Sequence, residues 1–442
     1  MINLYDFAYG VSLGVTAPFW LAKSTARRKV FNALHDRMGN CSPRVGDEPA
    51  VLIHAVSLGE MNATRALVGA LADARADLKF IVTTTTETGF NRGREIYGND
   101  SRITLIHYPL DFSVAVNRVL DNLRPSIVVL MELEVWPNFV YQCERRKIPV
   151  VLVNGRLTTG SFRNYRRGGM IVKRMFGRLA AVCAQEQLYA DRFILLGARA
   201  ECVRMTGTMK FDNAQIADRI AGADELASAV GLNPGLEPIW VCGSTGPGEE
   251  QLILDIYRQL LVESPQLRLV LVPRKPERFD EVAKLIESSG FSVVRRSQSP
   301  DHNPDPSDPM KSNARVILGD TMGELRKFYS LADIVFVGRT LIDLGARQHG
   351  SDMIEPAALA KPTIVGPYTG NFTEVMNLLR SANAIMEVAS ANDLKQVVGE
   401  MLSSQETVTK MGQRAREVVR SAQGATARNT TIIRHYLPPA RT

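Results

Sequence analysis

Carboxylates follow directly after two strongly apolar runs of this sequence. The run AVLIHAV (50–56) leads to Glu60, and the run PSIVVLME (125–132) ends in Glu132, with Glu134 two residues further on. A positioned carboxylate can act as a general base that removes a proton from a hydroxyl nucleophile. In an extended stretch Glu132 and Glu134 point the same way, so their mutual repulsion raises the pKa of one of them.

These acids also have a purely structural interpretation, because acids at helix starts are stabilised by the helix dipole. The spacing alone favours this interpretation for Glu60, which follows the turn residue Gly59. For Glu132 and Glu134 it is as good as the catalytic one, since a helix is expected to begin at Pro137. Lys210, near a predicted hinge, can neutralise a leaving phosphate, although a solvated surface lysine is the simpler interpretation.

Several segments with phosphate- or ribose-binding chemistry follow later apolar runs. Backbone N–H groups and hydroxyls of Gly243–Glu249, which opens a helical pattern, can hold a phosphate. This loop is neither a Walker A loop nor a GxGxxG fingerprint. Glu355 suits the two hydroxyls of a ribose. Because similar segments recur at one predicted sheet edge, we expect a nucleotide pocket built from Gly243–Glu249, Pro273–Pro276, Gly319–Glu324 and Asp352–Ala357.

The elements that must position these residues are strands alternating with amphipathic helices. Near-continuous Val/Ile/Leu runs indicate strands buried on both faces of a parallel sheet. The series breaks at a polar, Ala-rich stretch, 212–236, and then restarts with a strand at 238–244 and a helix at 249–263. We therefore expect an α/β protein of two doubly wound, Rossmann-like domains facing a central cleft, with ligands at the carboxyl ends of the strands.

The expected domain boundaries follow these breaks. The predicted parts are an N-terminal membrane anchor with a basic flank (1–30), a first Rossmann-like domain (31–213), a linker (214–236), a second Rossmann-like domain (237–420) and a C-terminal helix that packs back on the first domain (421–442).

Composition restricts the compartment and the partners. The 442 residues carry a net charge of +7, which attracts anionic partners without choosing among them. The five cysteines are scattered and odd in number, which fits a reducing compartment without structural disulfides. Neither histidines nor cysteines show metal-ligand spacing, so we expect no bound metal and no other cofactor.

Two segments indicate a membrane surface. Residues 4–22 form a weakly hydrophobic stretch that carries one charge, Asp6, and a basic cluster follows at 23–29. The charge lies on the wrong side for a cleaved signal peptide, so we expect a helix that spans or lies on the membrane, or packs on the protein. The stretch 161–178 carries six basic residues and no acid, interleaved with apolar ones, and fits a membrane surface or an ordinary exposed helix.

A series of motifs, taken together and in order, resembles a known family. The motifs are His54–Glu60 (HAVSLGE), Met131–Asn138 (MELEVWPN), Gly207–Phe211 (GTMKF), Gly243–Thr245 (GST), Pro273–Phe279 (PRKPERF), Gly319–Leu325 (GDTMGEL), Glu355–Ala357 (EPA) and Gly366–Phe372 (GPYTGNF). They resemble the 3-deoxy-D-manno-octulosonic acid (Kdo) transferases of lipopolysaccharide assembly, and the resemblance extends from the N-terminal segment to the last helices.

This resemblance implies a GT-B fold and an inverting, metal-independent transfer of Kdo from CMP-Kdo to a lipid A precursor, at the cytoplasmic face of the inner membrane. Carried onto this sequence, Glu60 is the general base, and Glu132 and Lys210 support the transition state. The positions that match the CMP-binding segments are Pro273, Arg274, Met322, Gly323, Glu324, Asp352, Met353, Ile354 and Glu355.

The sequence departs from the family pattern at Gly345–Glu355. This stretch is longer than usual and has Asp352 where asparagine is typical. An acid near a phosphate is unfavourable unless a cation screens it. The competing interpretations are a GT-B enzyme for another nucleotide sugar, a sugar-nucleotide epimerase and an inactive membrane-bound homologue. A nucleic-acid partner is not expected, because the basic residues form no recognised nucleic-acid-binding motif.

Overall fold

The computed structural model describes residues 5–7, 9–10, 34–299, 316–345 and 348–440. Most of the predicted anchor and its basic flank lies outside these ranges. Within them, no helix has the length and apolar character needed to cross a membrane. The chain divides into two compact units: unit 1 comprises Met1–Asn213 with Ala422–Thr442, and unit 2 comprises Ala214–Ser421.

Unit 1 is built on a parallel seven-stranded sheet in the order β3-β2-β1-β4-β5-β6-β7. Its strands are β1 (Ala50–His54), β2 (Lys79–Thr84), β3 (Ile103–His107), β4 (Ile127–Met131), β5 (Val150–Gly155), β6 (Ala181–Ala184) and β7 (Val203–Met205). Its helices are α3 (Leu34–Arg37), α4 (Leu58–Ala74), α5 (Glu87–Tyr97), α6 (Ser113–Leu123), α7 (Pro137–Arg145), α8 (Thr159–Arg166), α9 (Gly169–Gly177), α10 (Gln187–Leu195) and α20 (Ala425–His435).

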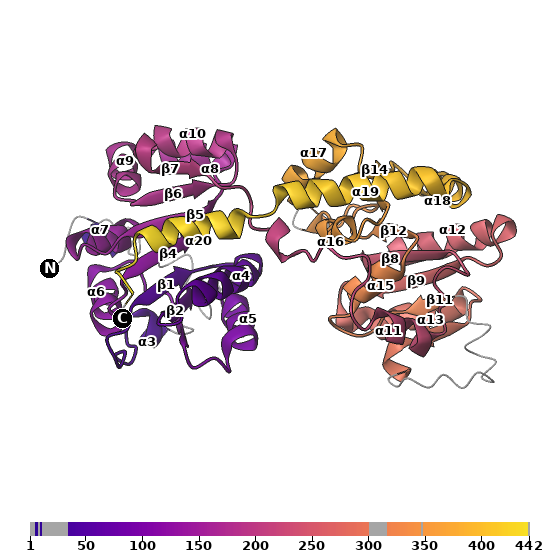
Figure 1. Cartoon of the computed structure of the whole chain (residues 1–442), viewed down its shortest axis with the longest axis horizontal. Helices are drawn as coiled ribbons and strands as arrows, with labels where there is room; N and C mark the ends of the chain where they lie inside the picture. Colours follow the sequence, from indigo (N-terminus) through magenta and orange to yellow (C-terminus); the bar gives the residue numbers. More distant parts are fainter. Residues whose placement is uncertain (1–4, 8, 11–33, 300–315, 346–347, 441–442) are drawn as a thin grey trace. The chain divides into compact units, whose positions relative to one another are not determined.

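Alternate residues of each central strand enter opposite cores of unit 1. Leu52 of β1 belongs to one buried cluster, and its neighbours Val51 and Ile53 belong to the other. Both faces of the sheet are therefore covered, which explains the uninterrupted apolar runs. The C-terminal α20 packs against α4 and β5, and its Ile433 joins the second cluster (Figure 1).

Unit 2 repeats the design with the order β10-β11-β9-β8-β12-β13-β14. Its strands are β8 (Ile239–Thr245), β9 (Arg268–Pro273), β10 (Val293–Arg295), β11 (Val316–Leu318), β12 (Ile334–Val337), β13 (Thr363–Val365) and β14 (Met386–Glu387). Its helices are α11 (Ala223–Val230), α12 (Glu249–Glu263), α13 (Phe279–Ser288), α15 (Leu325–Leu331), α16 (Ile354–Ala358), α17 (Thr373–Ser381), α18 (Ala391–Ser403) and α19 (Gln405–Ala422). The stretch 214–236, predicted as a linker, contains α11, which packs against α15 in this unit.

A fully buried carboxylate, Glu249, joins the two central loops of unit 2. One of its oxygens accepts hydrogen bonds from the N–H groups of Gly246 (2.9 Å) and Arg339 (2.6 Å). The other accepts from Thr340 and Leu341, each at 2.9 Å. Burial raises the pKa of Glu249, and these four N–H groups act against that rise. The loops after β8 and β12 thus share one acceptor at the first residue of α12.

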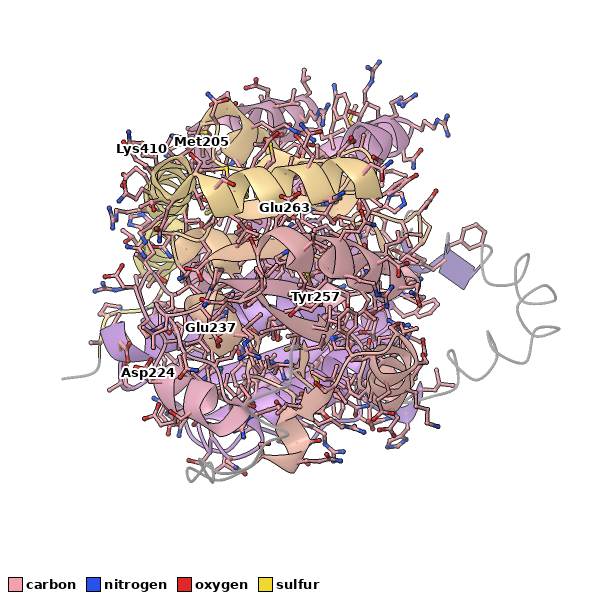
Figure 2. All side chains as sticks on the ribbon, turned by 90° about the vertical axis from the view of Figure 1, so that its right-hand side faces the viewer. Met205, Asp224, Glu237, Tyr257, Glu263 and Lys410 are labelled. Carbon is pink, nitrogen blue, oxygen red and sulfur yellow. The ribbon has the colours of Figure 1, made fainter. Side chains whose placement is uncertain are left out.

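We predict that Glu249→Gln destabilises the protein by about 3 kcal/mol, because an amide NH₂ would face two buried N–H donors and leave them unpaired. The measurement is the urea midpoint followed by tryptophan fluorescence, with Trp240 of β8 as the reporter in unit 2. Glu263→Gln is the control, since Glu263 is exposed at the other end of the same helix (Figure 2). Equal midpoints for the two variants would contradict the assigned role of Glu249.

Candidate functional site

The acidic residues predicted from the sequence lie at the carboxyl edge of the unit 1 sheet. β1 lies between β2 and β4 in the sheet. The strand that follows β1 in the chain, β2, pairs with one side of it, and β4 pairs with the other side. Such a point of reversed strand order is where doubly wound sheets bind ligands. Glu60 follows β1, and Glu132 and Glu134 follow β4.

Glu60 is the third residue of α4 and forms a capping box with Ser57. The Ser57 hydroxyl accepts the Glu60 N–H at 3.1 Å, and the Glu60 carboxylate accepts the N–H groups of Val56 (3.0 Å) and Ser57 (3.3 Å). The structural interpretation of Glu60 is therefore correct. It does not exclude a catalytic one, because a carboxylate offers about four acceptor positions and only two are used by these bonds.

The prediction of an extended stretch through Glu132 and Glu134 is wrong. β4 ends at Met131, and Glu132 adopts a left-handed conformation with φ +52°. Its backbone is fixed from β5, since its N–H donates to Val153 O (3.0 Å) and its carbonyl accepts from Arg156 N (3.3 Å). The chain turns at Glu132, so the two side chains do not follow strand alternation.

Glu134 is the carboxyl group whose pKa is displaced. Burial, together with the charges of Glu60 and Glu132, raises its pKa from 4.5 to about 6. The Trp136 indole N–H donates to its Oε2 at 3.2 Å, which favours the ionised form. The three acids of the β1 and β4 loops therefore interact electrostatically, and at neutral pH they concentrate negative charge at this edge.

His54, the last residue of β1, lies behind Glu134. Its ring is completely buried, stacks on Tyr108 at 3.6 Å and contacts Thr83 Oγ1 through Nδ1 at 3.0 Å. Burial lowers its pKa to about 3, so the ring is neutral at physiological pH. Its Nε2 lies 3.9 Å from Glu134 Oε2. A neutral imidazole leaves the charge of Glu134 uncompensated, which is consistent with the raised pKa of that acid.

The structural interpretation of Glu132 and Glu134 required one of them to cap α7. The N-terminus of α7 is capped by another residue instead. Asp111, from the loop after β3, accepts the N–H groups of Asn138 (3.0 Å) and Phe139 (2.8 Å). Burial raises the pKa of Asp111 to about 7. The sequence analysis missed this residue, because its partner helix begins 26 positions later in the chain. The β4 acids are consequently not needed as caps for the helix.

Lys210 lies at the same edge, beyond β7 in a segment held from two sides. Asn154 Oδ1, at the end of β5, accepts the Met209 N–H at 3.0 Å. Arg428 of α20 donates to Thr206 O at 2.8 Å. Gly207 has φ +85° and lets the segment turn. The following 3₁₀ turn, Phe211–Asn213, packs against α4, the helix that contains Glu60.

The predicted donor residues lie at the carboxyl edge of the unit 2 sheet. Pro273 ends β9, and the Arg274 N–H donates to Thr245 O of β8 at 3.0 Å. Met322 is 67 % exposed, and Gly323 has φ +87°. Glu324 does not extend into solvent, because Arg296 (2.9 Å) and Lys327 (3.2 Å) bind its carboxylate. These bonds hold the pKa of Glu324 below its usual value despite its burial.

The segment Asp352–Glu355 precedes and opens α16 on the far side of β12. Asp352 Oδ1 accepts the Ile354 N–H at 2.9 Å, and Met353 and Ile354 are buried. The half-buried Glu355 carboxylate pairs with Arg326 Nε at 2.8 Å. The charges of Asp352, Glu355 and Arg274 all act on the buried hydroxyl of Tyr329. The segment after β9 and the segment after β12 therefore come close to one another around Tyr329.

A cavity of about 580 Å³ opens at the opposite edge of unit 2, at the amino ends of β8, β12 and β13. Its cations bond to protein groups: Lys361 Nζ donates to Ala332 O at 2.9 Å, and Arg416 pairs with Asp218 at 2.7 Å. It contains none of the predicted site residues. Across the described part of the chain, no group of three or more His, Cys, Asp or Glu side chains is arranged to hold a metal ion.

The basic stretch 161–178 forms α8 and α9 of unit 1. Met170 and Ile171 are 64 % and 49 % exposed at the start of α9, among exposed arginines. The described N-terminal residues lie beside it: Arg178 donates to the Tyr5 hydroxyl at 3.3 Å. Asp6 accepts the Ser113 N–H at 2.7 Å and the Asn138 side-chain amide at 3.1 Å. Asp6 is thus a helix-capping residue of unit 1.

Two parallel-sheet α/β units of this kind make up the GT-B fold. Solved structures with this fold include a glycosyltransferase from Rickettsia africae (TM-score 0.55, 12 % identity, 88 % of this chain and 98 % of that one). Another is Anabaena HepE in complex with UDP (TM-score 0.55, 14 % identity, 88 % and 99 %). Identities this low show the fold alone.

Sequence comparison defines the family. Residues 32–213 match the family model described as 3-deoxy-D-manno-octulosonic-acid transferase. The 3-deoxy-D-manno-octulosonic acid transferase of Haemophilus influenzae is 34 % identical over 90 % of this chain and 88 % of its own length. The enzyme of the same name from Bordetella pertussis is 31 % identical over 88 % and 87 %. The chain belongs to the Kdo transferase family and is a glycosyltransferase.

The raised pKa of Glu134 predicts a pH-dependent effect of Glu134→Gln. A raised carboxyl pKa contributes stability that is present below pH 4.5 and lost as the pH rises through 6. The variant, which stays neutral, should match the wild type near pH 4.5 and exceed its unfolding free energy by up to about 2 kcal/mol at pH 8. Thermal unfolding at both pH values measures this, with the exposed Glu201→Gln as control. A difference that does not change with pH would contradict the assignment.

Proposed function

We propose that this enzyme transfers Kdo from CMP-Kdo to a lipid A precursor, with inversion at the anomeric carbon and without a metal ion. Family membership supports the donor sugar. The observation that carries the chemistry is the acidic edge of unit 1, where Glu60, Glu132 and Glu134 interact, with Lys210 in the segment after β7 of the same sheet. An attacking hydroxyl needs a base, and a positioned carboxylate supplies one.

In the proposed reaction Glu60 takes the proton of the acceptor hydroxyl. The hydroxyl oxygen forms a bond to the anomeric carbon of Kdo, and the bond from that carbon to the phosphate oxygen breaks, so that CMP leaves with the electron pair. The N–H groups of Val56 and Ser57 fix the direction of the Glu60 carboxylate before substrate arrives. Preorganisation of this kind avoids reorientation during the reaction.

Glu132 and Lys210 support the transition state in this proposal. The left-handed backbone of Glu132 is fixed by bonds to β5, and Lys210 follows a segment fixed by Asn154 and Arg428. A lysine is suited to offset negative charge that develops on the departing phosphate. We assign donor binding to unit 2, through Pro273 and Arg274, the loop Met322–Glu324, and Asp352–Glu355, in which Glu355 accepts the ribose hydroxyls.

We predict that Glu60→Gln abolishes transfer, with a loss of at least about a hundredfold in kcat, because general-base catalysis is removed. CMP affinity should be unchanged, since the assigned CMP residues lie in unit 2. The assay measures transfer of Kdo from CMP-Kdo generated in place, alongside calorimetric titration with CMP. Because the glutamine also weakens the capping box, Ser57→Ala serves as the matched control: it loses a cap without losing the carboxylate. Comparable activity losses in both variants would assign Glu60 a structural role only.

We further propose that the enzyme works at an anionic membrane, on the cytoplasmic face of the inner membrane. The basic α8 and α9 with exposed Met170 and Ile171, and the N-terminal residues beside them, support this orientation. Basic residues near an anionic surface each contribute about 1 kcal/mol.

Charge reversal on this face of α8 and α9 should therefore weaken co-sedimentation with phosphatidylglycerol vesicles more than charge reversal on unit 2. In the unit 1 variant, Arg163, Arg167 and Lys173 are all replaced by Glu. In the unit 2 variant, Lys284, Lys395 and Lys410 are all replaced by Glu. Equal co-sedimentation would contradict the assigned face.

A further inference from the structure

Arg339 occupies a constrained position at the centre of the unit 2 sheet edge. It comes two residues after β12, the neighbour of β8 on the side away from β9. Its φ is +61°, a conformation that non-glycine residues rarely adopt. The backbone is fixed on both sides, because its N–H donates to Glu249 and its carbonyl accepts from Gly350 N at 2.7 Å. The direction in which the side chain leaves the loop is therefore set by the fold.

The Arg339 side chain lies across the loop that opens α12. A Cβ atom added to Gly246 would come within 2.9 Å of Arg339 Cγ. The same Cβ would come within 2.6 Å of Leu344 Cδ1, so any larger residue at position 246 would displace the Arg339 stem, the Leu344 side chain or both. The stem of Arg339 packs on this loop, and its charge interacts with that of Glu249, the first residue of α12.

The guanidinium of Arg339 has hydrogen-bonding capacity to spare. Its Nη2 donates to Gln348 O at 3.0 Å, and its Nε is buried without a hydrogen-bond partner. A buried unsatisfied donor costs about 1–3 kcal/mol. The carboxylate whose charge acts on Arg339, that of Glu249, already accepts four backbone N–H groups. Because the Nε–H is shielded from solvent, an acceptor from outside the protein satisfies it only when the arginine side chain moves on binding.

A second guanidinium acts on the same place. Arg274 follows β9, on the other side of β8, and its N–H donates to Thr245 O. Burial and the charge of Arg274 lower the pKa of Arg339, and the charge of Glu249 acts in the opposite direction. Two cations held near one another repel unless anions balance them. Arg274 and Arg339 beside the single carboxylate of Glu249 leave a net positive charge at the topological switch point of unit 2.

We propose that Arg339 binds an anionic group of the sugar-nucleotide donor, together with Arg274. The proposal rests on the proposed function, in which the donor carries two such groups, the phosphate of CMP and the carboxylate of Kdo. Either can accept the parallel N–H donors of a guanidinium.

The test uses the full-length protein with Arg339→Gln, which keeps a polar stem and removes the charge. Arg339→Lys restores the charge, and Lys284→Gln, an exposed site on α13, controls for the loss of one positive charge. Calorimetry measures CMP affinity, NMR titration measures cytidine affinity, and initial rates give KM and kcat for CMP-Kdo. Urea midpoints confirm that the variants are folded.

If Arg339 contacts the phosphate, Arg339→Gln weakens CMP binding by about tenfold or more and leaves cytidine binding unchanged. If it contacts the sugar carboxylate, CMP affinity is unchanged and KM for CMP-Kdo rises by a similar factor while kcat is kept. Partial recovery in Arg339→Lys supports either contact. Equal losses for CMP and cytidine would mean that Arg339 only shapes the loop, and no change in any of these would also overturn the proposal.

The same titrations separate this proposal from the proposed function. If the wild type binds UDP or GDP and not CMP, the CMP-Kdo assignment fails. A loss of UDP or GDP affinity in Arg339→Gln, without a matching loss for the free nucleoside, would then still support the anion site. If the wild type binds CMP and the variant binds it equally, with an unchanged KM for CMP-Kdo, the arginine contact fails while the donor assignment stands.

Discussion

The hydrogen bonds of Glu249 are the constraint on which unit 2 depends. A carboxylate without solvent contact is costly unless its charge is satisfied by donors, and here four backbone N–H groups from two loops converge on it. Because these loops follow β8 and β12, the bonds fix the point where strand order reverses. The residues of these two loops, including Arg339, are positioned relative to that carboxylate.

The adjacent Glu250 extends this arrangement to a third loop. It is also fully buried and forms a two-pronged ion pair with Arg278 (2.6 and 3.1 Å), in the turn after β9 that contains Arg274. Two consecutive glutamates at the start of α12 thus fasten the loops after β8, β9 and β12. Unit 1 uses a related device, in which the buried Asp111 holds the start of α7 and Glu60 caps α4. In both units, carboxylates that accept backbone N–H groups shape the functional edge.

The strands and helices were predictable because strands that are buried on both faces of a parallel sheet consist of consecutive apolar residues. The helix expected at 249–263 has those bounds in the structure. The two-residue β14 was missed, since Met386 and Glu387 are exposed and form no apolar run. The fold class followed from the alternation of strands and helices, and the family from the order of the motifs.

The sequence predicted which residues belong to the candidate sites, but it did not predict their backbone conformation or their burial. Sequence reasoning placed Glu60 and Glu132 at strand ends and Lys210 near a hinge. The turn at Glu132 arises from bonds to Val153 and Arg156, and no local residue signals it. The left-handed conformation of Arg339 could not be predicted for the same reason. It is fixed by hydrogen bonds to Glu249 and Gly350, neither of which is adjacent to Arg339 in the sequence. The raised pKa of Glu134 depends on burial that only the tertiary structure supplies.

The most direct test of the account is a transfer reaction with the wild-type protein, a detergent-dispersed lipid A precursor and CMP-Kdo generated in place, in the presence of EDTA. Mass spectrometry of the lipid product identifies what has been transferred. The account predicts a product heavier by one or more Kdo units, formed only when the CMP-Kdo supply is active. Unmodified acceptor under these conditions, with sugar transfer instead from a UDP- or GDP-linked donor, would contradict it.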